Sequence, residues 1–173
     1  MANIPSIEIL LSKYFKPEAE RVLKEHPELI TKIIPICLTN EAPMCWRAAW
    51  VTRTVIEEND ARVRPYIDKI LDVLPEKEDG HQRELMKLLQ LMKLSDDQES
   101  ILFDQSVTIW ESVRKKPSVR YTAFEHIIKM VYKYPELEQE LDAITQPQYL
   151  NSLSPGVKAG VLKSLSKLKQ SKE

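Results

Sequence analysis

One stripe of aromatic and charged residues has types and spacing that could do chemistry. Trp46, Trp50, Arg53 and Glu57 recur at i, i+4, i+7 and i+11, a spacing that places side chains on one face of a helix. Tryptophan rings can stack on a base or hold a peptide side chain, and a neighbouring arginine adds a cation. The stripe points away from the more apolar side of the same segment. A recognition surface is one interpretation of this pattern.

A second candidate is a column of basic residues that recurs along the chain. Arg47, Arg83, Arg120 and Lys158 are separated by 36, 37 and 38 residues, and each opens an apolar, helix-compatible run. Such cations can meet an acidic partner. They can also bond to backbone carbonyls at helix ends and stiffen the structure. The sequence leaves both roles open and favours the second.

Signatures of catalysis and of cofactor or metal binding are not found in the sequence. The three glycines form no phosphate-binding loop, and the three histidines are too far apart for a helical metal-binding pair. Cys37 and Cys45 have no histidine close in sequence, so we expect two small buried hydrophobes rather than a reactive thiol. We therefore predict no catalytic residue, no metal site and no cofactor, and a protein that is not an enzyme.

Composition and charge narrow the class of protein. The 173 residues are 43% hydrophobic and 29% charged, which is typical of one globular domain. The net charge of −1 does not call for nucleic acid or anionic lipid as a partner. The apolar stretches are too short to span a bilayer, and two cysteines in a chain without a leader favour a reducing compartment. We expect a soluble cytoplasmic protein with no membrane association.

Scarce glycine and frequent proline indicate an all-α fold. Three glycines and 11 prolines suit a helix array, because proline starts and stops helices whereas sheet turns need glycine. Ser6 and Ser118 are the expected N-caps, Pro35 should kink or shorten its helix, and Pro147 should interrupt one. The expected helices cover residues 6–15, 18–25, 27–38, 44–58, 66–74, 81–94, 99–113, 119–134, 135–144 and 155–168.

The helices fall into pairs with a nearly constant period. First helices begin near Pro27, Pro65, Asp97 and Pro135, spaced by 38, 32 and 38 residues, while second helices carry the basic column. A period of this length is the mark of stacked helix pairs. We predict a single domain over residues 1–173, with N-terminal capping helices at 1–26, about four helix-pair repeats at 27–169 and a frayed tail at 170–173.

Two segments of the predicted second helices resemble those of HEAT repeats. Val119–Phe124 and Val157–Leu162 each begin with a valine followed by a basic residue and continue with small and apolar residues, as in that family. The resemblance spans about residues 27–169 and implies an α-α superhelix, a HEAT-like or armadillo-like solenoid of about ten antiparallel helices. HEAT repeats usually carry an Asp about six residues before the Arg. Here those positions hold Glu41, Lys77, Arg114 and Ser152.

The repeat register offers a second interpretation of the two tryptophans. Most of the positions equivalent to Trp46 and Trp50 in the later repeats are apolar, which fits packing between repeats. A packed tryptophan removes roughly 150–250 Å² from water. Packing is the favoured interpretation, and an exposed recognition stripe is the alternative. Trp110, inside a long apolar run, is expected in the core.

The favoured function is a non-catalytic scaffold or interaction module that binds a protein segment on the concave face of the solenoid. Its partner would present acidic or aromatic residues to the basic column and to the stripe of Trp46, Trp50, Arg53 and Glu57. The alternative is a nucleic-acid-binding protein, or an enzyme similar to the HEAT-like DNA alkylation-repair glycosylases, which use tryptophans and an acidic residue in a basic groove. Glu57 would then supply the carboxylate. The acidic residues among the basic ones disfavour this alternative, because each phosphate contact needs a cation.

Overall fold

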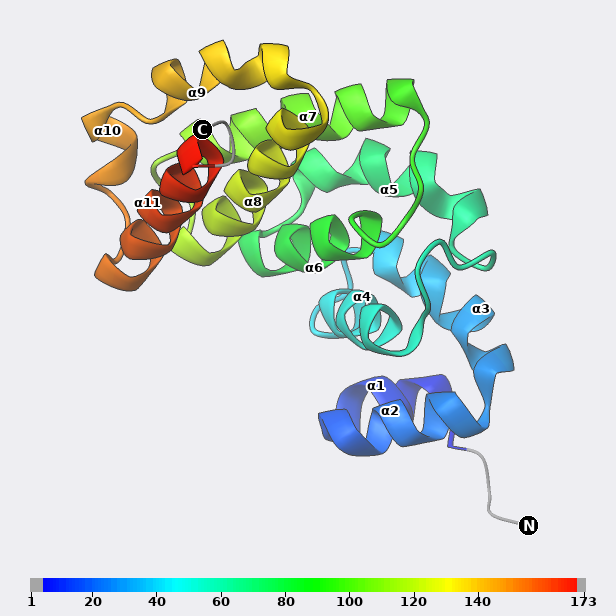
Figure 1. Ribbon diagram of the computed structural model, residues 1–173. Helices are drawn as coiled ribbons and strands as arrows, with labels where there is room; N and C mark the ends of the chain where they lie inside the picture. The colour runs from blue at the N-terminus through cyan, green and yellow to red at the C-terminus, as the bar shows by residue number, and fades with distance from the viewer. Residues whose placement is uncertain (1–4, 171–173) are drawn as a thin grey trace. The chain divides into compact units, whose positions relative to one another are not determined.

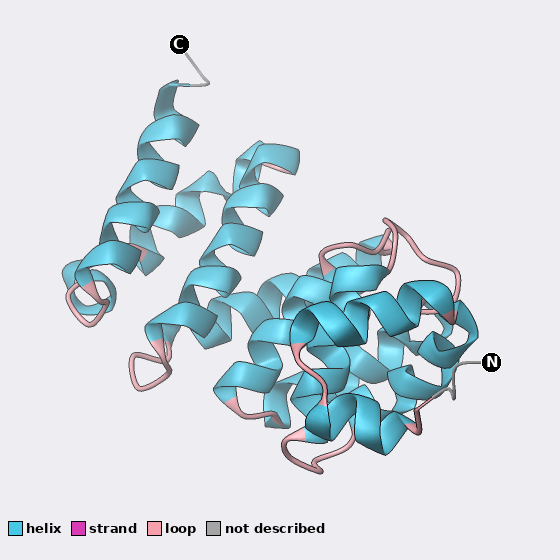
Figure 2. Ribbon diagram, turned by 90° about the horizontal axis from the view of Figure 1, so that it is seen from below, coloured by secondary structure: helices cyan, strands magenta, loops and turns pink. Residues whose placement is uncertain are grey.

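Helices make up every regular element in the part of the chain that the structure, a computed structural model, describes, residues 5–170 (Figures 1 and 2). The chain divides into two compact units, Met1–Ser95 and Asp96–Glu173. The single domain over residues 1–173 stays a prediction. Of the predicted frayed tail at 170–173, Gln170 ends the last helix, and residues 171–173 lie outside the described residues.

The first unit consists of α-helices joined by short 3-10 helices, labelled η. Ser6 Oγ accepts a hydrogen bond from the Ile9 N–H at 3.3 Å, so the predicted N-cap is confirmed. Prolines occupy the first turns of α2, η1, η2, η3 and η4, a position that suits their fixed φ. The elements are α1 (Ile7–Lys13), α2 (Lys16–Glu25), η1 (Pro27–Leu29), α3 (Ile30–Ile33), η2 (Ile34–Leu38), α4 (Met44–Val55), η3 (Arg64–Tyr66), α5 (Ile67–Val73), η4 (Leu74–Glu76) and α6 (Asp79–Leu89).

The segment expected to be one kinked helix at residues 27–38 is in fact three short pieces, η1, α3 and η2. Pro35 is the second residue of η2. Because Pro35 has no N–H, the α-helical bond to the carbonyl four residues earlier cannot form. The chain therefore tightens into a 3-10 helix at this point. The prediction that Pro35 shortens its helix is confirmed.

Two predicted helix ends in the first unit are wrong by three residues or more. Helix α4 ends at Val55 rather than at residue 58, and α6 ends at Leu89 rather than at residue 94. A tertiary contact holds both loops, because the Asn59 N–H donates to the Leu91 carbonyl at 2.8 Å. Asn59 also adopts a φ of 56°, a left-handed conformation that Asn tolerates better than most residues. Helical periodicity alone does not reveal such a contact.

The core of the first unit lies around α4, which packs against η2 and α6. Cys45, Ala48 and Ala49 are buried on the α4 side of this contact, and Cys37 is buried on η2. Both cysteines are therefore the buried small residues that the sequence predicts. Burial raises the pKa of the Cys37 thiol to about 12, so the thiol stays protonated and unreactive at neutral pH.

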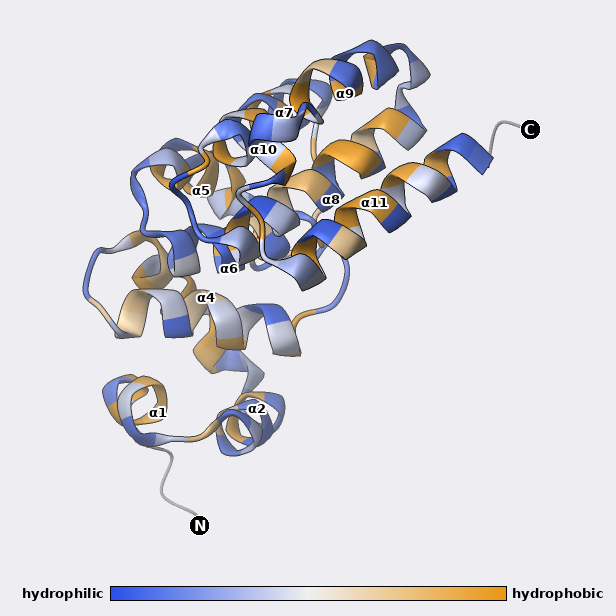
Figure 3. Cartoon of the chain, turned by 90° about the vertical axis from the view of Figure 1, so that its left-hand side faces the viewer, coloured by the Kyte–Doolittle hydropathy of each residue, from blue (hydrophilic) through white to orange (hydrophobic). Residues whose placement is uncertain are grey.

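The second unit is built around α8, which packs against α7 and α11 (Figure 3). Ser118 lies inside the first turn of α8 and is not its N-cap, because Pro117 already adopts the helical φ and starts the helix two residues earlier than predicted. Pro147 starts a short helix, as well as ending the preceding helical stretch. The elements are α7 (Asp96–Glu111), α8 (Pro117–Lys133), η5 (Pro135–Leu137), α9 (Glu138–Ile144), α10 (Pro147–Leu150) and α11 (Pro155–Gln170).

Trp110 lies at the centre of the core of the second unit, as the sequence predicts. Its side chain is fully buried, and its ring centroid is 4.6 Å from that of Phe124 on α8. The indole Nε1–H donates to the Ile144 carbonyl at the end of α9, at 2.7 Å. The one polar atom of this large ring therefore has a hydrogen-bond partner, so burial of the ring leaves no polar group unsatisfied.

Candidate functional site

Two members of the basic column each bond to a group within their own unit. Arg47 on α4 is half-buried, and its Nη2 donates to the carbonyl of Tyr14, the C-cap of α1, at 2.6 Å. Lys158 on α11 donates from Nζ to Asn151 Oδ1 at 2.9 Å. Arg47 therefore fastens the end of one helix to another, which matches the favoured structural role.

Arg120 on α8 is fully buried, with no exposed side-chain surface. Its guanidinium donates to the Trp110 carbonyl at 2.8 Å, to the Tyr149 carbonyl at 2.9 Å and to Ser152 Oγ at 2.7 Å. The same group lies 4.8 Å from the centroid of the Trp110 ring. The proposal of Arg120 as a surface binding residue therefore needs correction. Its guanidinium bonds to groups inside the protein and is not available to a partner at the surface.

Arg83 on α6 differs from the other members of the column because its partner is a carboxylate. Arg83 Nε donates to Glu84 Oε1 at 3.1 Å, and Arg53 Nε of α4 donates to Glu84 Oε2 at 3.2 Å. The Glu84 side chain is only 3% exposed, while those of Arg53 and Arg83 are 26% and 37% exposed. Two partly exposed guanidiniums therefore share one buried carboxylate.

The two tryptophans lie on the same face of α4 as Arg53, as their spacing predicts. Trp46 keeps 38% of its surface exposed, and Trp50 is half-buried. The ammonium of Lys16 lies 5.4 Å from the Trp50 ring centroid, and the Arg47 guanidinium lies 6.0 Å from that of Trp46. Both rings are partly exposed and each has a cation near it, so neither of the two interpretations holds alone.

Glu57 does not continue this stripe. Helix α4 ends at Val55, Ile56 is extended, and Glu57 lies in the exposed loop beyond it. The predicted position one helical turn after Arg53 is therefore wrong, because the predicted helix was three residues too long. The carboxylate that Arg53 meets belongs to Glu84, which the sequence places directly after Arg83 on another helix.

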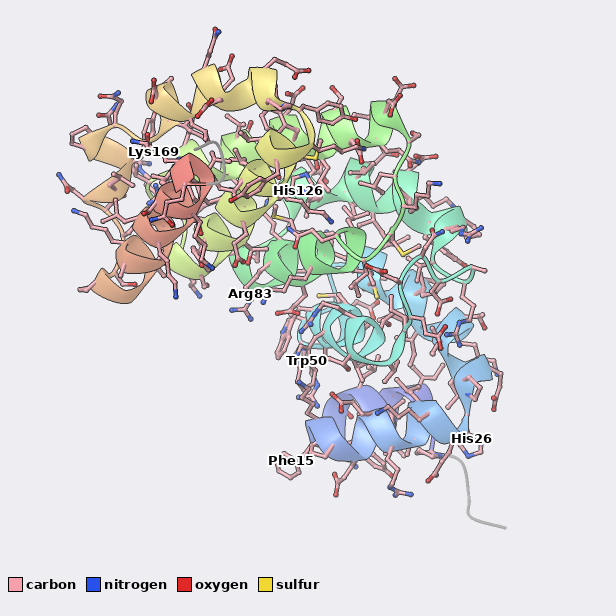
Figure 4. All side chains as sticks on the ribbon, viewed as in Figure 1. Phe15, His26, Trp50, Arg83, His126 and Lys169 are labelled. Atoms are coloured by element: carbon pink, nitrogen blue, oxygen red, sulfur yellow. The ribbon has the colours of Figure 1, made fainter. Side chains whose placement is uncertain are left out.

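Phe15 is a surface residue that the sequence analysis did not single out. At the start of α2 its side chain is 77% exposed, the largest exposed fraction of any large apolar residue in the described chain. Figure 4 shows Phe15, Trp50 and Arg83 along one edge of the first unit. The helix expected over residues 6–15 included Phe15, but α1 ends at Lys13 and Phe15 is the N-cap of α2, outside both helices. We call Phe15, Lys16, Trp46, Trp50, Arg53 and Arg83 the aromatic–basic surface.

Lys77 replaces the Asp that the resemblance to HEAT repeats leads one to expect before Arg83. Its ammonium donates to the carbonyls of Leu38 and Thr39 at 2.7 and 3.0 Å, and to Asn40 Oδ1 at 2.6 Å. His81 Nε2 lies 2.8 Å from the Cys37 carbonyl at the same helix end. Here side-chain donors that bond to backbone carbonyls link the neighbouring helices, so no Asp is needed for this link.

Neither a metal site nor a membrane span stands out in the described chain. Within residues 5–170 no three His, Cys, Asp or Glu side chains gather closely enough to hold a metal ion. The helices in that range are too short or too polar to cross a lipid bilayer.

Comparison with known proteins identifies one family. A model of the HEAT repeat domain matches residues 16–168. The match starts at α2, one helix earlier than the repeats predicted from residue 27, and ends near the end of α11. Searches of curated proteins and of solved structures return no match.

Proposed function

Because the chain belongs to the HEAT repeat domain family, we propose that it is a non-catalytic module that binds a protein segment through the aromatic–basic surface. The all-helical fold is that of an α-solenoid, and HEAT repeats commonly mediate interactions between proteins. Repeat folds of this kind present rigid surfaces to their partners. The partner segment carries acidic and aromatic side chains.

The shared carboxylate of Glu84 is the observation that carries this proposal. One buried carboxylate holds two guanidiniums, so the group of Arg53, Arg83 and Glu84 keeps one net positive charge at neutral pH. Both guanidiniums are partly exposed, and their forked geometry suits a second carboxylate. An acidic residue of a partner would neutralise this charge.

The aromatic residues beside this charge supply contact area. Trp46 and Trp50 are held on a regular helix, so a partner that packs on them orders few side chains. Tryptophan and arginine are also the residues that most often dominate binding energy at protein interfaces. An aromatic or aliphatic side chain next to an acidic one therefore matches this surface.

Peptide selection on the full chain tests the proposal. We expect peptides selected from a random phage-displayed library to combine Asp or Glu with Phe, Tyr or Trp. Trp46→Ala and Arg83→Gln should each weaken binding of the selected peptide about 30-fold, because each removes a dominant interface residue. Both positions are partly exposed, so circular dichroism should show unchanged helicity.

Lys32→Glu is the matched control, because Lys32 is an exposed cation on α3 outside the aromatic–basic surface. This variant should bind the selected peptide as the natural chain does. Selected peptides without acidic residues, or equal losses in the control, would overturn the proposal. So would tight, steeply salt-dependent binding of a duplex DNA oligonucleotide that competes with the peptide, since that behaviour is typical of phosphate contacts.

A further inference from the structure

We propose that a groove along α7, in the second unit, binds a basic amphipathic segment of a partner protein. This groove shares no residue with the aromatic–basic surface, and its charge has the opposite sign. The two proposals therefore stand or fall independently.

The groove consists of two adjoining recesses, of about 380 and 460 Å³. Phe103 on α7 and Leu137 on η5 line both recesses, so the two adjoin and we treat them as one groove. The α7 residues that line it run from Asp96 to Thr108. At 1.5 Å per residue this stretch is about 18 Å long, enough for three turns of a partner helix. That length suits a peptide segment better than a single ion.

The floor of the groove is apolar. Phe103, Val107 and Leu137 are half-buried, whereas Met130 and Ile144 are buried at its base. Such a floor accepts the apolar side of a helix, whose residues recur every three or four positions.

The rim of the groove is acidic. Five carboxylates line the two recesses, and none of the described residues that line them is a Lys or Arg. The carboxylates belong to Asp96, Glu99, Asp104, Glu136 and Glu140.

One of these carboxylates already has a cation. Glu99 accepts from Lys133 Nζ at 2.6 and 2.7 Å and from Tyr134 Oη at 2.9 Å. Lys133 offsets only one of the five negative charges, so the rim keeps a clear excess. Lysine or arginine residues flanking an apolar stripe complement this arrangement, while a nucleic acid or an acidic peptide would be repelled.

A designed peptide provides the probe. It has 16 residues, with Leu at helical i, i+3, i+4 and i+7 spacing and Lys at the other positions, and a fluorescent label. A second peptide replaces every Lys with Glu. Anisotropy measured with the full chain should show binding of the Lys peptide, weaker at high salt, and no binding of the Glu peptide.

Charge reversal at the rim locates the binding site. Asp104 and Glu140 are exposed, so the double variant Asp104→Lys/Glu140→Lys should fold normally and weaken the Lys peptide about tenfold or more. Asp142→Lys is the control, because Asp142 lies on the same helix α9 but lines a different recess. This control should bind the peptide within about twofold of the natural chain.

Three results would overturn the inference. One is an equal loss in the control and in the double variant. Another is undiminished binding by the double variant. In the third, the Lys peptide fails to bind, and sedimentation shows that the natural chain self-associates whereas the double variant does not. The groove would then bind a second copy of this chain. Trp46→Ala and Arg83→Gln should leave Lys-peptide binding unchanged, which separates this test from that of the aromatic–basic surface.

Discussion

Arg83 and Arg120 occupy the same position of successive repeats, yet they have opposite environments. Arg83, in the first unit, is partly exposed and bonds to a carboxylate, whereas Arg120, in the second unit, is fully buried and bonds to two carbonyls and a hydroxyl. Their sequence neighbours explain the difference. Gln82 donates to the carbonyls of Leu74 and Pro75 at the end of the preceding helix, so Arg83 is not needed there.

The third repeat has no such glutamine. The residue before Arg120 is Val119, which has no polar group, so Arg120 itself satisfies the Trp110 carbonyl near the end of the preceding helix. Buried carbonyls at a helix end need donors, and the repeat uses whichever neighbouring side chain can reach them. In these two repeats the residue beside the arginine accounts for whether the arginine is internal or stays at the surface.

The largest expected effect is that of removing Arg120. Arg120→Ala leaves the carbonyls of Trp110 and Tyr149 without this donor and opens a cavity, so the free energy of unfolding should fall by about 4 kcal/mol. Arg83→Ala should cost about 1 kcal/mol or less, because Arg53 remains with Glu84 and the site is partly exposed. Urea unfolding of both variants measures the difference. Equal losses of unfolding free energy in the two variants would contradict the contrast between Arg83 and Arg120.

Acid should destabilise the second unit through His126. Both ring nitrogens of this buried residue are without a hydrogen-bond partner among the described residues. Burial, with a contribution from Lys129, lowers the pKa of His126 to about 4 from its ordinary value of 6.5. Because the folded state favours the neutral ring, its contribution to stability is present above pH 6.5. That contribution is lost as the pH falls towards 4, by roughly 3 kcal/mol in total.

The variant His126→Met should remove this part of the pH dependence between pH 6.5 and 4, and should not lower stability at pH 7, since it removes two unbonded nitrogens. His81 in the first unit provides the contrast. Burial also lowers its pKa, but its ring is bonded to the Cys37 carbonyl. His81→Met should therefore lower stability at pH 7. Urea unfolding at several pH values measures both variants, and an unchanged profile for His126→Met would refute the assignment.

Gln82→Val tests the reason given for the difference between the two arginines. The change places the valine of the third repeat in the second and removes the donor to the carbonyls of Leu74 and Pro75. We expect a loss of about 2 kcal/mol in the free energy of unfolding, the cost of unmet buried polar groups. Lys87→Val, half-buried on the same helix, is a control of matched size change. Similar losses in the two variants would show that Gln82 has no special role.

The smallest effect concerns the pair of arginines on Glu84. Arg53→Ala and Arg83→Ala should each cost little, because the other arginine still pairs the buried carboxylate. The double variant leaves Glu84 buried without either cation, so it should lose about 1 kcal/mol more than the sum of the single changes. A double-mutant cycle by urea unfolding gives this coupling energy. Strict additivity would mean that Glu84 does not couple the two arginines.

The approximate places where several helices begin were predictable in this chain, although α6, α7 and α8 start two or three residues earlier than predicted, whereas several helix ends were not predictable. Prolines mark the beginnings of α2, α8 and α11, and they act through the local backbone alone. The ends of α4 and α6 depend on the bond from Asn59 to Leu91, between residues distant in sequence. Glu57 was placed on the stripe by the same error. The periodicity of apolar residues along the chain carries no information about a contact between two loops.

The surface was predictable in part. The spacing of Trp46, Trp50 and Arg53 correctly predicts that they share a helix face, since helical geometry depends only on the chain. The exposure of Phe15 and the shared carboxylate of Glu84 depend on how α2, α4 and α6 pack together. The acidic groove along α7 likewise combines residues of four helical segments, α7, α8, η5 and α9, so no single stretch of sequence contains its pattern.

By itself, the sequence determined the all-helical repeat and the recurring position of its basic residues. Proline, apolar periodicity and the repeat length act locally or through a fixed register, and all are visible in the order of residues. Only the tertiary structure decided which basic residue is buried, because that depends on the donors that neighbouring side chains bring to the carbonyls at helix ends. Gln82 meets that need in one repeat and Arg120 in the next. Buried polar groups must be satisfied, but the side chain that satisfies them is selected by distance and packing.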